Sequence, residues 1–182
     1  MQLYLVRHAA VVVRPDQPSE QWHLSPEGRV AAESLAGEGG WAGLARLYSS
    51  PEPKAIATAQ RIATRNALPL SIEAALHEVE RPWTDGDYRA LARSYLRGEA
   101  VEGWEGRDVA TARIRRAIET IAAAHGEADV GIVSHGLILS LYLTDLLSLD
   151  GAATVELWDG IGFPDYALVD TVDLKLVRRF GG

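Results

Sequence analysis

The sequence predicts an α/β fold: a three-layer sandwich with a mostly parallel central sheet and helices on both faces. Two observations support this. Short apolar runs of strand length alternate with longer segments of helical spacing, and Pro, Gly and N-cap residues mark the junctions between them. The length of 182 residues, with 47% hydrophobic and 24% charged residues, fits one globular domain over residues 1–182.

The chain begins with a strand, a loop and a helix. The apolar run Leu3–Val6 predicts the strand, and the Pro-containing segment Val11–Gln21 predicts the loop. Ser25 is a good N-cap and Pro26 suits the first helical position, so a helix is expected from there to about Ala36. Three glycines are expected to end this helix: Gly37, Gly39 and Gly40.

The next segment repeats the strand–helix–strand pattern. Leu44–Ser49 is an apolar run that predicts a second strand. Ser50 is expected to cap a helix that has Pro51 in its first turn and continues to about Arg65. Leu68–Ile72 predicts the third strand.

The middle of the chain predicts two helices with irregular segments before each. Leu76–Asp87 is rich in acidic and aromatic residues and has no clear period. Asp87–Arg97 has apolar residues at helical spacing, and Val101–Asp108 contains Gly and Trp and predicts a loop. Val109–His125 predicts a long amphipathic helix, which Gly126 ends.

The last part of the chain predicts one more parallel strand and an antiparallel ending. Val130–Ser134 is the fourth strand, and a helix is expected from His135-Gly136 to about Leu149. The remaining expected elements are a loop at Trp158–Asp165 and strands at Tyr166–Val169 and Asp173–Val177, joined by a hairpin around Asp170-Thr171.

Composition excludes several classes of function. The formal net charge of -7 argues against general nucleic-acid binding, because no excess of cations is present to replace counterions. The sequence contains no run of eighteen apolar residues, so it predicts no membrane span. No secretory signal pattern is visible at the N-terminus. The absence of cysteine excludes disulfides, thiolate metal sites and a cysteine nucleophile. We therefore expect a cytoplasmic protein.

Two predicted strands end in histidine. Arg7-His8 follows the first strand and Ser134-His135-Gly136 follows the fourth. In parallel sheets ligands bind beyond the carboxyl ends of the strands, so the two imidazoles converge if these strands are neighbours. A helix that starts at Gly136 would also direct backbone N–H groups toward the same place, which suits an anion. From spacing alone, an anion site and a purely structural role for the histidines both remain open.

Four segments in order resemble one known family. The segments LYLVRHA, LSPEGRVAAESLA, SSPEPKAIATA and VGIVSHGLIL are similar to motifs of the histidine phosphatase superfamily, the phosphoglycerate mutase-like proteins. The resemblance extends from residue 3 to about residue 145. It implies the phosphoglycerate mutase-like fold and a phosphoryl-transfer chemistry that uses a histidine nucleophile and neither metal nor cofactor.

The resemblance also implies a role for each matching residue. His8 would attack phosphorus and form a phosphohistidine, with its second ring nitrogen held by a backbone carbonyl. Arg7, Lys54 and Gly136 would bind the phosphate, and His135 would donate to the transferring group.

A glutamate in a Leu-x-Glu context serves as the general acid in this family. The stretch LHEVERPW places Glu78 at that position, and Glu80 is its rival. If this stretch is extended, both side chains point the same way, so spacing does not separate them.

Two positions depart from the family pattern. Lys54 stands where the family has arginine, which loses the bidentate grip on a phosphoryl group. Ala9 stands where the family usually has glycine. These changes leave open a slow enzyme, an unusual substrate, or a binding protein without activity.

The expected function is hydrolysis of a small phosphorylated metabolite. A mutase must retain its intermediate beneath a substantial lid, whereas the lid insert here, around residues 78–108, is small. Phosphoglycerate mutase-type transfer and a non-catalytic phospho-ligand binding protein are the alternatives. A metal hydrolase is disfavoured, because no His pair has the i, i+4 spacing that a helical metal site would use.

Overall fold

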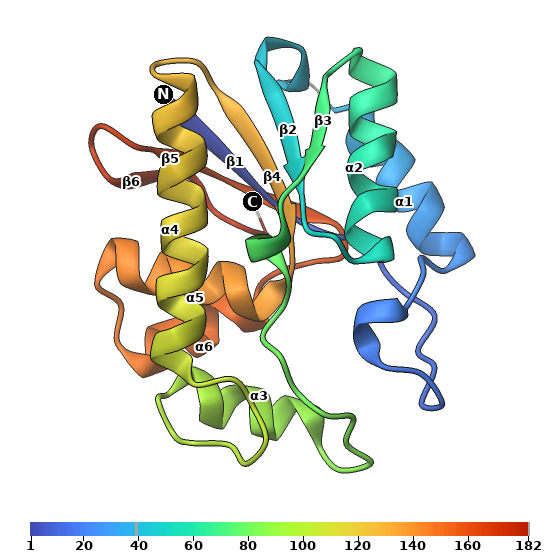
Figure 1. Cartoon of the computed structure of the whole chain (residues 1–182), viewed down its shortest axis with the longest axis vertical. Helices are drawn as coiled ribbons and strands as arrows, with labels where there is room; N and C mark the ends of the chain where they lie inside the picture. Colours follow the sequence, from blue (N-terminus) through green and yellow to red (C-terminus); the bar gives the residue numbers. More distant parts are fainter. Residues whose placement is uncertain (39, 182) are drawn as a thin grey trace.

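A six-stranded sheet of order β3-β2-β4-β1-β5-β6 runs through the computed structural model (Figure 1). The structure describes residues 1–38 and 40–181. The strands are β1 (Gln2–Arg7), β2 (Arg46–Ser49), β3 (Leu70–Ile72), β4 (Val130–Ser134), β5 (Asp165–Asp170) and β6 (Lys175–Arg178). Strands β3, β2, β4 and β1 are parallel, and β5 and β6 complete the sheet in antiparallel pairs. The predicted mostly parallel sheet is confirmed.

In the part of the chain that the structure describes, six α-helices and three short 3₁₀ turns connect the strands. The helices are α1 (Pro26–Ala36), α2 (Pro53–Asn66), α3 (Tyr88–Leu96), α4 (Arg107–His125), α5 (Gly136–Leu147) and α6 (Gly151–Asp159). The 3₁₀ turns are η1 (Ser19–Gln21), η2 (Trp41–Gly43) and η3 (Ala74–Leu76). Within the described residues, none of these helices is long and apolar enough to cross a membrane.

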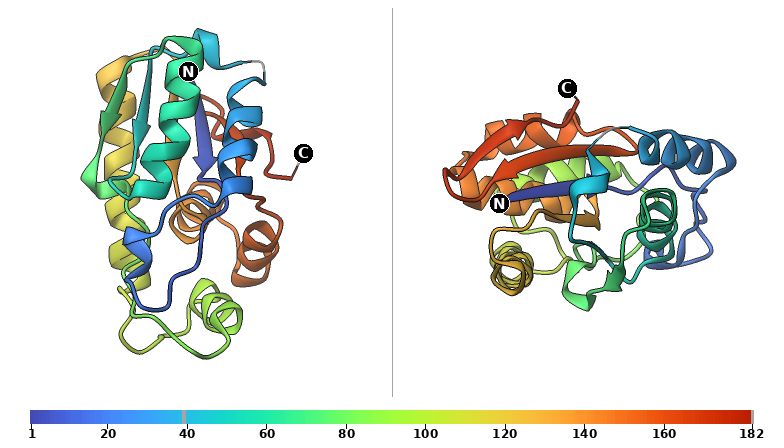
Figure 2. Two further views of the ribbon diagram at one scale, coloured as in Figure 1. Left: turned by 90° about the vertical axis from the view of Figure 1, so that its right-hand side faces the viewer. Right: turned by 90° about the horizontal axis from the view of Figure 1, so that it is seen from above.

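Two hydrophobic cores lie on opposite faces of the sheet. Along β1, Leu3 and Leu5 pack with residues of α3, α4, α5 and α6, whereas Tyr4 and Val6 pack with α1 and α2. This follows from the alternation of side chains along a strand. Seen from above, α1 and α2 group at one side of the molecule and α4 and α5 at the other (Figure 2). The three-layer arrangement is therefore confirmed.

Local signals fix several helix ends as predicted. The side chain of Ser25 accepts the N–H of Gly28 (3.0 Å) at the start of α1, and Asp87 accepts the N–H of Ala90 (3.1 Å) at the start of α3. Helix α1 ends at Gly37. Gly39, which was expected to help end it, lies outside the described residues.

Several predicted boundaries are wrong. Helix α2 has Glu52, not Ser50, at its N-cap, because the N–H of Ser50 donates to the oxygen of Val133 (2.9 Å) and extends the β2–β4 ladder. Helix α4 starts at residue 107, not 109, and the β5–β6 turn spans 171–174.

Helix α6 was not predicted. Helix α5 ends at Leu147, before the predicted 149, because Ser148 adopts a left-handed conformation (φ 52°). Asp150 then accepts the N–H of Ala153 (2.8 Å) and starts α6 within the apolar stretch that follows.

Candidate active site

The two histidines meet at the carboxyl edge of the sheet. Strands β1 and β4 are neighbours, with Arg7 opposite Ser134, so the condition for the two imidazoles to converge is met. The N–H of His8 donates to the oxygen of Ser134 (3.0 Å), which continues this ladder by one residue. The rings of His8 and His135 lie with their centroids 5.0 Å apart. The strand pairing alone therefore brings the two imidazoles together.

The ring of His8 is held in one tautomer. Its Nδ1 donates to the backbone oxygen of Ala9 (2.8 Å), as expected, because a carbonyl oxygen can only accept. In the neutral ring Nε2 then carries the lone pair. Burial lowers the pKa of His8 well below its usual value, and His135 and the positive charge of Lys54 lower it further. The geometry leaves a neutral, oriented imidazole.

Arg7 lies beside His8 with part of its guanidinium unused. Its Nη1 donates to the oxygen of Ile161 (2.8 Å), whereas its buried Nε has no partner among the described residues. The guanidinium carbon is 3.4 Å from the ring centre of Phe163, which covers its flat face. Burial lowers the pKa of Arg7 to about 10, so the side chain stays charged at neutral pH.

Gly136 makes room for Arg7. A Cβ atom at this position would lie 2.9 Å from the guanidinium carbon of Arg7. The first residue of α5 therefore allows the arginine to lie against the start of the helix.

His135 is completely buried and has two contacts on one ring nitrogen. Its Nε2 lies 2.7 Å from Oγ of Ser50 and 3.2 Å from Oε1 of Glu52. The hydrogen bond of Nε2 is to Oγ of Ser50, and the Glu52 carboxylate lies beside it. Nδ1 has no partner among the described residues. Burial lowers the pKa of His135 well below its usual value, and the positive charge of Lys54 adds to this effect.

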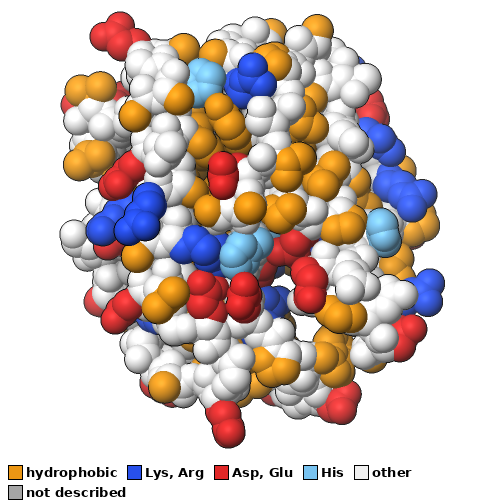
Figure 3. All heavy atoms as spheres, viewed as in Figure 1, with side chains coloured by type: hydrophobic (Ala, Val, Ile, Leu, Met, Phe, Trp, Pro, Cys, Tyr) orange, Lys and Arg blue, Asp and Glu red, His pale blue; other side chains and the backbone are white. Residues whose placement is uncertain are grey.

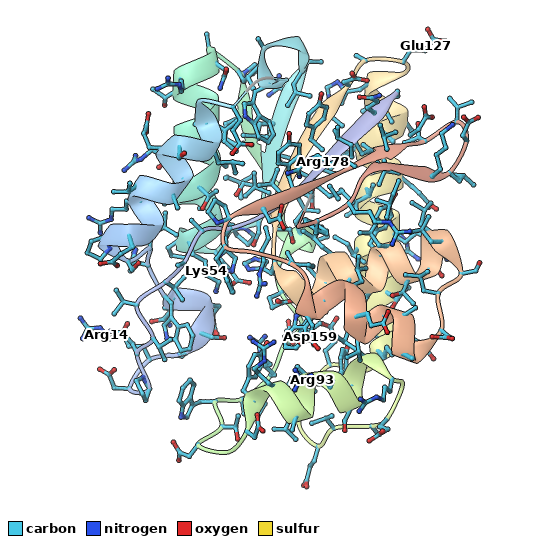
Figure 4. The ribbon with its side chains drawn as sticks, turned by 180° about the vertical axis from the view of Figure 1, so that it is seen from behind. Arg14, Lys54, Arg93, Glu127, Asp159 and Arg178 are labelled. Carbon is cyan, nitrogen blue, oxygen red and sulfur yellow. The ribbon has the colours of Figure 1, made fainter. Side chains whose placement is uncertain are left out.

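Lys54 points into this region, but its ammonium group is already bound. It forms an ion pair with Glu52 and donates to the oxygen of Ser19 (2.6 Å), where η1 meets the start of α2 (Figure 4). Only 5% of Lys54 is exposed. The structure thus brings this predicted phosphate ligand to the site and gives it two protein acceptors.

Glu78 caps helix α5. Its Oε1 accepts the N–H groups of Val79 and Ile138 (both 2.9 Å), and its Oε2 accepts that of Leu137 (3.1 Å). The expectation that the start of this helix offers free N–H groups is therefore wrong for Leu137 and Ile138. The anion at this helix N-terminus is a side chain of the protein itself.

Glu80 lies apart from the two histidines of the site. Its side chain is 76% exposed, and its nearest charged partner is His77, at 4.0 Å. Glu78 is half-buried, and its own N–H donates to Oε1 of Glu52 (2.8 Å). The prediction that both carboxylates point the same way is wrong. Glu78 faces the start of α5, and Glu80 faces outward.

The chain matches the family model for the histidine phosphatase superfamily (branch 1) over residues 3–159. It belongs to this superfamily. A comparison with curated proteins gives no match.

Solved structures share the fold of this histidine phosphatase superfamily member. A mycobacterial glucosyl-3-phosphoglycerate phosphatase in complex with VO₃ aligns with a TM-score of 0.82 at 21% identity, covering 100% of this chain and 99% of the other. YhfR from Bacillus stearothermophilus aligns with a TM-score of 0.81 at 20% identity, covering 99% and 96%. A phosphoserine phosphatase mutant from Entamoeba histolytica, in complex with phosphoserine, aligns with a TM-score of 0.76 at 18% identity, covering 97% and 94%.

Two residues of this superfamily member were missed by sequence reasoning. Glu52 follows β2, whose carboxyl end lies at the same sheet edge as those of β1 and β4. The rule that ligands bind beyond the carboxyl ends of parallel strands could therefore have indicated Glu52. Phe163 lies in the loop before β5, and nothing in its local sequence indicates that it covers Arg7.

Ala9, the second departure from the superfamily pattern, is fully buried. Its methyl group packs in a small cluster with Leu24 and Ala32, and its N–H donates to Oγ1 of Thr58 (3.1 Å). The residue therefore joins the loop after His8 to helices α1 and α2.

A cleft of about 490 Å³ in this superfamily member is lined in part by Glu52 and Glu78. Acidic side chains gather around a hollow near the middle of the face seen in Figure 3. The residues that line the cleft are Ser19, Glu20, Pro51, Glu52, Ala74, His77, Glu78, Val79, Glu80 and Arg81. The cleft is thus rich in carboxylates and has two basic side chains, one of them a histidine.

Proposed function

We propose that this chain is a phosphomonoester hydrolase that works through a phosphohistidine on His8, without a metal ion. One observation carries the proposal. His8 is held neutral with Nε2 free to attack, directly beside an arginine whose buried Nε has no partner in the described part of the chain. A nucleophile and an unused phosphate-binding donor at one strand end are what phosphoryl transfer to a side chain requires.

In the first step, the lone pair of His8 Nε2 attacks phosphorus. The P–N bond forms as the P–O bond to the leaving group breaks. Arg7 and His135 stabilise the negative charge on the transferring group. The leaving oxygen takes a proton from the carboxyl group of Glu78, the general acid of the proposal, whose carboxylate takes up this proton when the phosphate monoester binds.

In the second step, water replaces the histidine. The Glu78 carboxylate removes a proton from water, and the water oxygen attacks phosphorus. The P–N bond breaks, its electron pair returns to Nε2, and inorganic phosphate leaves. Glu78 again holds the proton that it gave up in the first step and releases it as phosphate leaves, so the enzyme returns to its starting state.

The structural neighbours support a small phosphorylated molecule as substrate. One neighbour is named a glucosyl-3-phosphoglycerate phosphatase, and another a phosphoserine phosphatase bound to phosphoserine. At 18–21% identity, the similarity to these neighbours shows a shared fold but not a shared substrate. The class of substrate therefore follows from the geometry of the site together with the substrates in the names of the neighbours.

The proposal includes a single domain over 1–182 with a small lid around residues 78–108. Trp83 from this segment meets Trp22 of the N-terminal loop with ring centroids 5.6 Å apart, and Arg81 lines the cleft. The middle of the segment is anchored, because Arg89 and Arg93 of α3 both pair with Asp159 of α6 (Figure 4). These contacts suit a lid that bends near Trp83 while α3 stays in place.

A second candidate function is phospho-ligand binding with little or no turnover. The ion pair between Lys54 and Glu52 favours it, because a cation expected to grip the phosphoryl group is already neutralised. Hydrolysis separates the two functions.

The test is hydrolysis of an aryl phosphate in the presence of EDTA, comparing wild type with His8→Ala and with His23→Ala, a change at an exposed histidine outside the site. His8→Ala should lose activity by roughly 10³-fold or more. His23→Ala should keep it. Acid quenching should trap a phosphohistidine in the wild type alone. Half of the activity remaining in His8→Ala would exclude the covalent mechanism, and loss of wild-type activity in EDTA would exclude metal independence.

A further inference from the structure

We propose that Glu52 sets the phosphate affinity of this site: its carboxylate pairs with Lys54 and lies beside His135, where a phosphoryl group would bind, so an anion binds by displacing it. The inference rests on the proposed phosphoryl site. Glu52 lies within the segment SSPEPKAIATA, but the superfamily resemblance assigns it no role.

The carboxylate of Glu52 is surrounded by groups of the kind that bind an anion. One oxygen, Oε2, pairs with the ammonium group of Lys54. The other, Oε1, accepts the N–H of Glu78 (2.8 Å) and lies 3.2 Å from Nε2 of His135. A cation, an imidazole ring and a backbone N–H thus surround one carboxylate that is 5% exposed.

Two of these three groups have been assigned to the phosphoryl group. Lys54 was expected to bind the phosphate, yet its ammonium group is held by Glu52 and the oxygen of Ser19. His135 was expected to donate to the phosphoryl group, yet its Nε2 is hydrogen-bonded to Ser50 and lies beside Glu52. A phosphoryl oxygen and a carboxylate oxygen are both acceptors and compete for the same hydrogens. The Nε atom of Arg7 is not involved in this competition, since it has no partner among the described residues.

The charge of the site leads to the same conclusion. Arg7 and Lys54 are positive, Glu52 and Glu78 are negative, and burial keeps both histidines neutral. The four charged groups sum to zero, so the site offers little net attraction to a phosphate dianion. Removing the charge of Glu52 would leave a net positive site and release Lys54 at once.

The test uses Glu52→Gln in the full chain, with inorganic phosphate as the probe. Glutamine keeps the size of the side chain and an oxygen for the Glu78 N–H, but has no charge to hold Lys54. Phosphate binding is measured by calorimetry or ³¹P NMR at constant pH and ionic strength. The dissociation constant should fall by about tenfold or more, which corresponds to about 1.4 kcal/mol. Glu73→Gln is the control, because its carboxylate accepts the N–H of Ala75 (3.0 Å). It should change the constant by less than about twofold.

The opposite result overturns the inference. If Glu52→Gln binds phosphate as weakly as wild type, or more weakly, Glu52 is not a competitor and serves only to position its neighbours. Phosphate binding is measured without turnover, so this inference and the proposed hydrolase can fail separately. If Glu52→Gln binds phosphate more tightly but the wild type hydrolyses no phosphate ester, the role of Glu52 is supported and the hydrolase is contradicted. If the wild type hydrolyses phosphate esters but Glu52→Gln binds phosphate no more tightly, the hydrolase is supported and the role of Glu52 is contradicted.

A measurement on the wild type covers the case in which Glu52→Gln does not fold. With ¹³C-labelled glutamate and ¹⁵N-labelled histidine, added phosphate should shift the Glu52 carboxyl signal and the His135 Nε2 signal together. Both shifts should saturate with one dissociation constant. Phosphate that binds without moving these two signals, or no phosphate binding at all at millimolar concentrations, overturns the inference.

Discussion

The ammonium group of Lys54 is paired with the carboxylate of Glu52, and each residue is only 5% exposed. Lys54→Met should therefore destabilise the protein by roughly 3 kcal/mol, because it leaves an uncompensated carboxylate in the interior. The double change Glu52→Gln with Lys54→Met should restore most of this loss. Urea unfolding of wild type, both single variants and the double variant measures the free energy of unfolding for a double-mutant cycle.

The chain contains a matched control for this pair. Lys175 is paired with Asp173, also two residues before it, but these side chains are 60% and 56% exposed. Lys175→Met should change the free energy of unfolding by less than about 0.5 kcal/mol. If Lys54→Met costs no more than Lys175→Met, the pair with Glu52 is not buried in solution.

Glu78 and Glu80 can be separated by the leaving group of the substrate. Glu78→Gln should slow hydrolysis of an alkyl phosphate by about 10²–10⁴-fold, because the alkoxide needs a proton as it leaves. An aryl phosphate with an acidic phenol needs less help and should be slowed much less. The readout is kcat/KM for both substrates. Glu80 is largely exposed, so Glu80→Gln should leave both substrates within about twofold of wild type.

The same substitution tests the structural role of Glu78. Its carboxylate caps helix α5 through the N–H groups of Leu137 and Ile138. Glu78→Gln should also lower the free energy of unfolding by about 1 kcal/mol, since the amide keeps one acceptor but loses the charge at the helix N-terminus. Equal slowing of alkyl and aryl substrates, together with this loss of stability, would assign Glu78 a structural role alone.

Phe163 should tune the binding of phosphate by Arg7. Its ring lies 3.4 Å from the guanidinium carbon and shields one face from water. Phe163→Ala should raise KM by about two- to fivefold, equivalent to the roughly 0.5–1 kcal/mol of a cation–π contact. Phe163→Leu keeps an apolar cover without the π face. If Leu restores KM fully, shielding and not the cation–π contact is responsible, and an unchanged KM in Phe163→Ala would show that Phe163 does not act on Arg7.

The sequence predicted the part of the site that depends on strand ends. His8 and His135 each follow an apolar run, and the carboxyl ends of parallel strands meet at one edge. The contact between their rings therefore follows from the order of the strands. The same local periodicity predicted the position, though not every boundary, of each parallel strand.

The rest of the site depends on contacts between segments far apart in the chain. Glu78 caps a helix that begins 58 residues later, and Glu52 is buried only because Lys54, Glu78 and His135 converge on it. A glutamate between two prolines gives no local sign of burial. Helix α6 was missed for a similar reason, because its start depends on the left-handed conformation of Ser148, which no period in the sequence indicates.

The two buried histidines make stability depend on pH. Burial lowers the pKa values of His8 and His135 well below their usual value, whereas in the unfolded chain both imidazoles titrate near pH 6.5. Below that pH the unfolded state takes up protons that the folded state does not. The free energy of unfolding should therefore fall as the pH drops below about 6.5, by up to about 1.4 kcal/mol per pH unit for each histidine.

Urea unfolding of wild type, His8→Gln and His23→Gln at pH 7.5, 6.5 and 5.5 measures this dependence. Removing His8 removes one of the two protons, so the fall between pH 6.5 and 5.5 should be smaller in His8→Gln by up to about 1.4 kcal/mol. His23 is exposed, and its replacement should leave the wild-type pH dependence in place. Carboxylates contribute equally to all three proteins and cancel in the comparison. If His8→Gln loses as much stability as wild type over this interval, His8 takes up its proton in the folded protein as well, and the neutral nucleophile on which the proposed mechanism depends is not maintained.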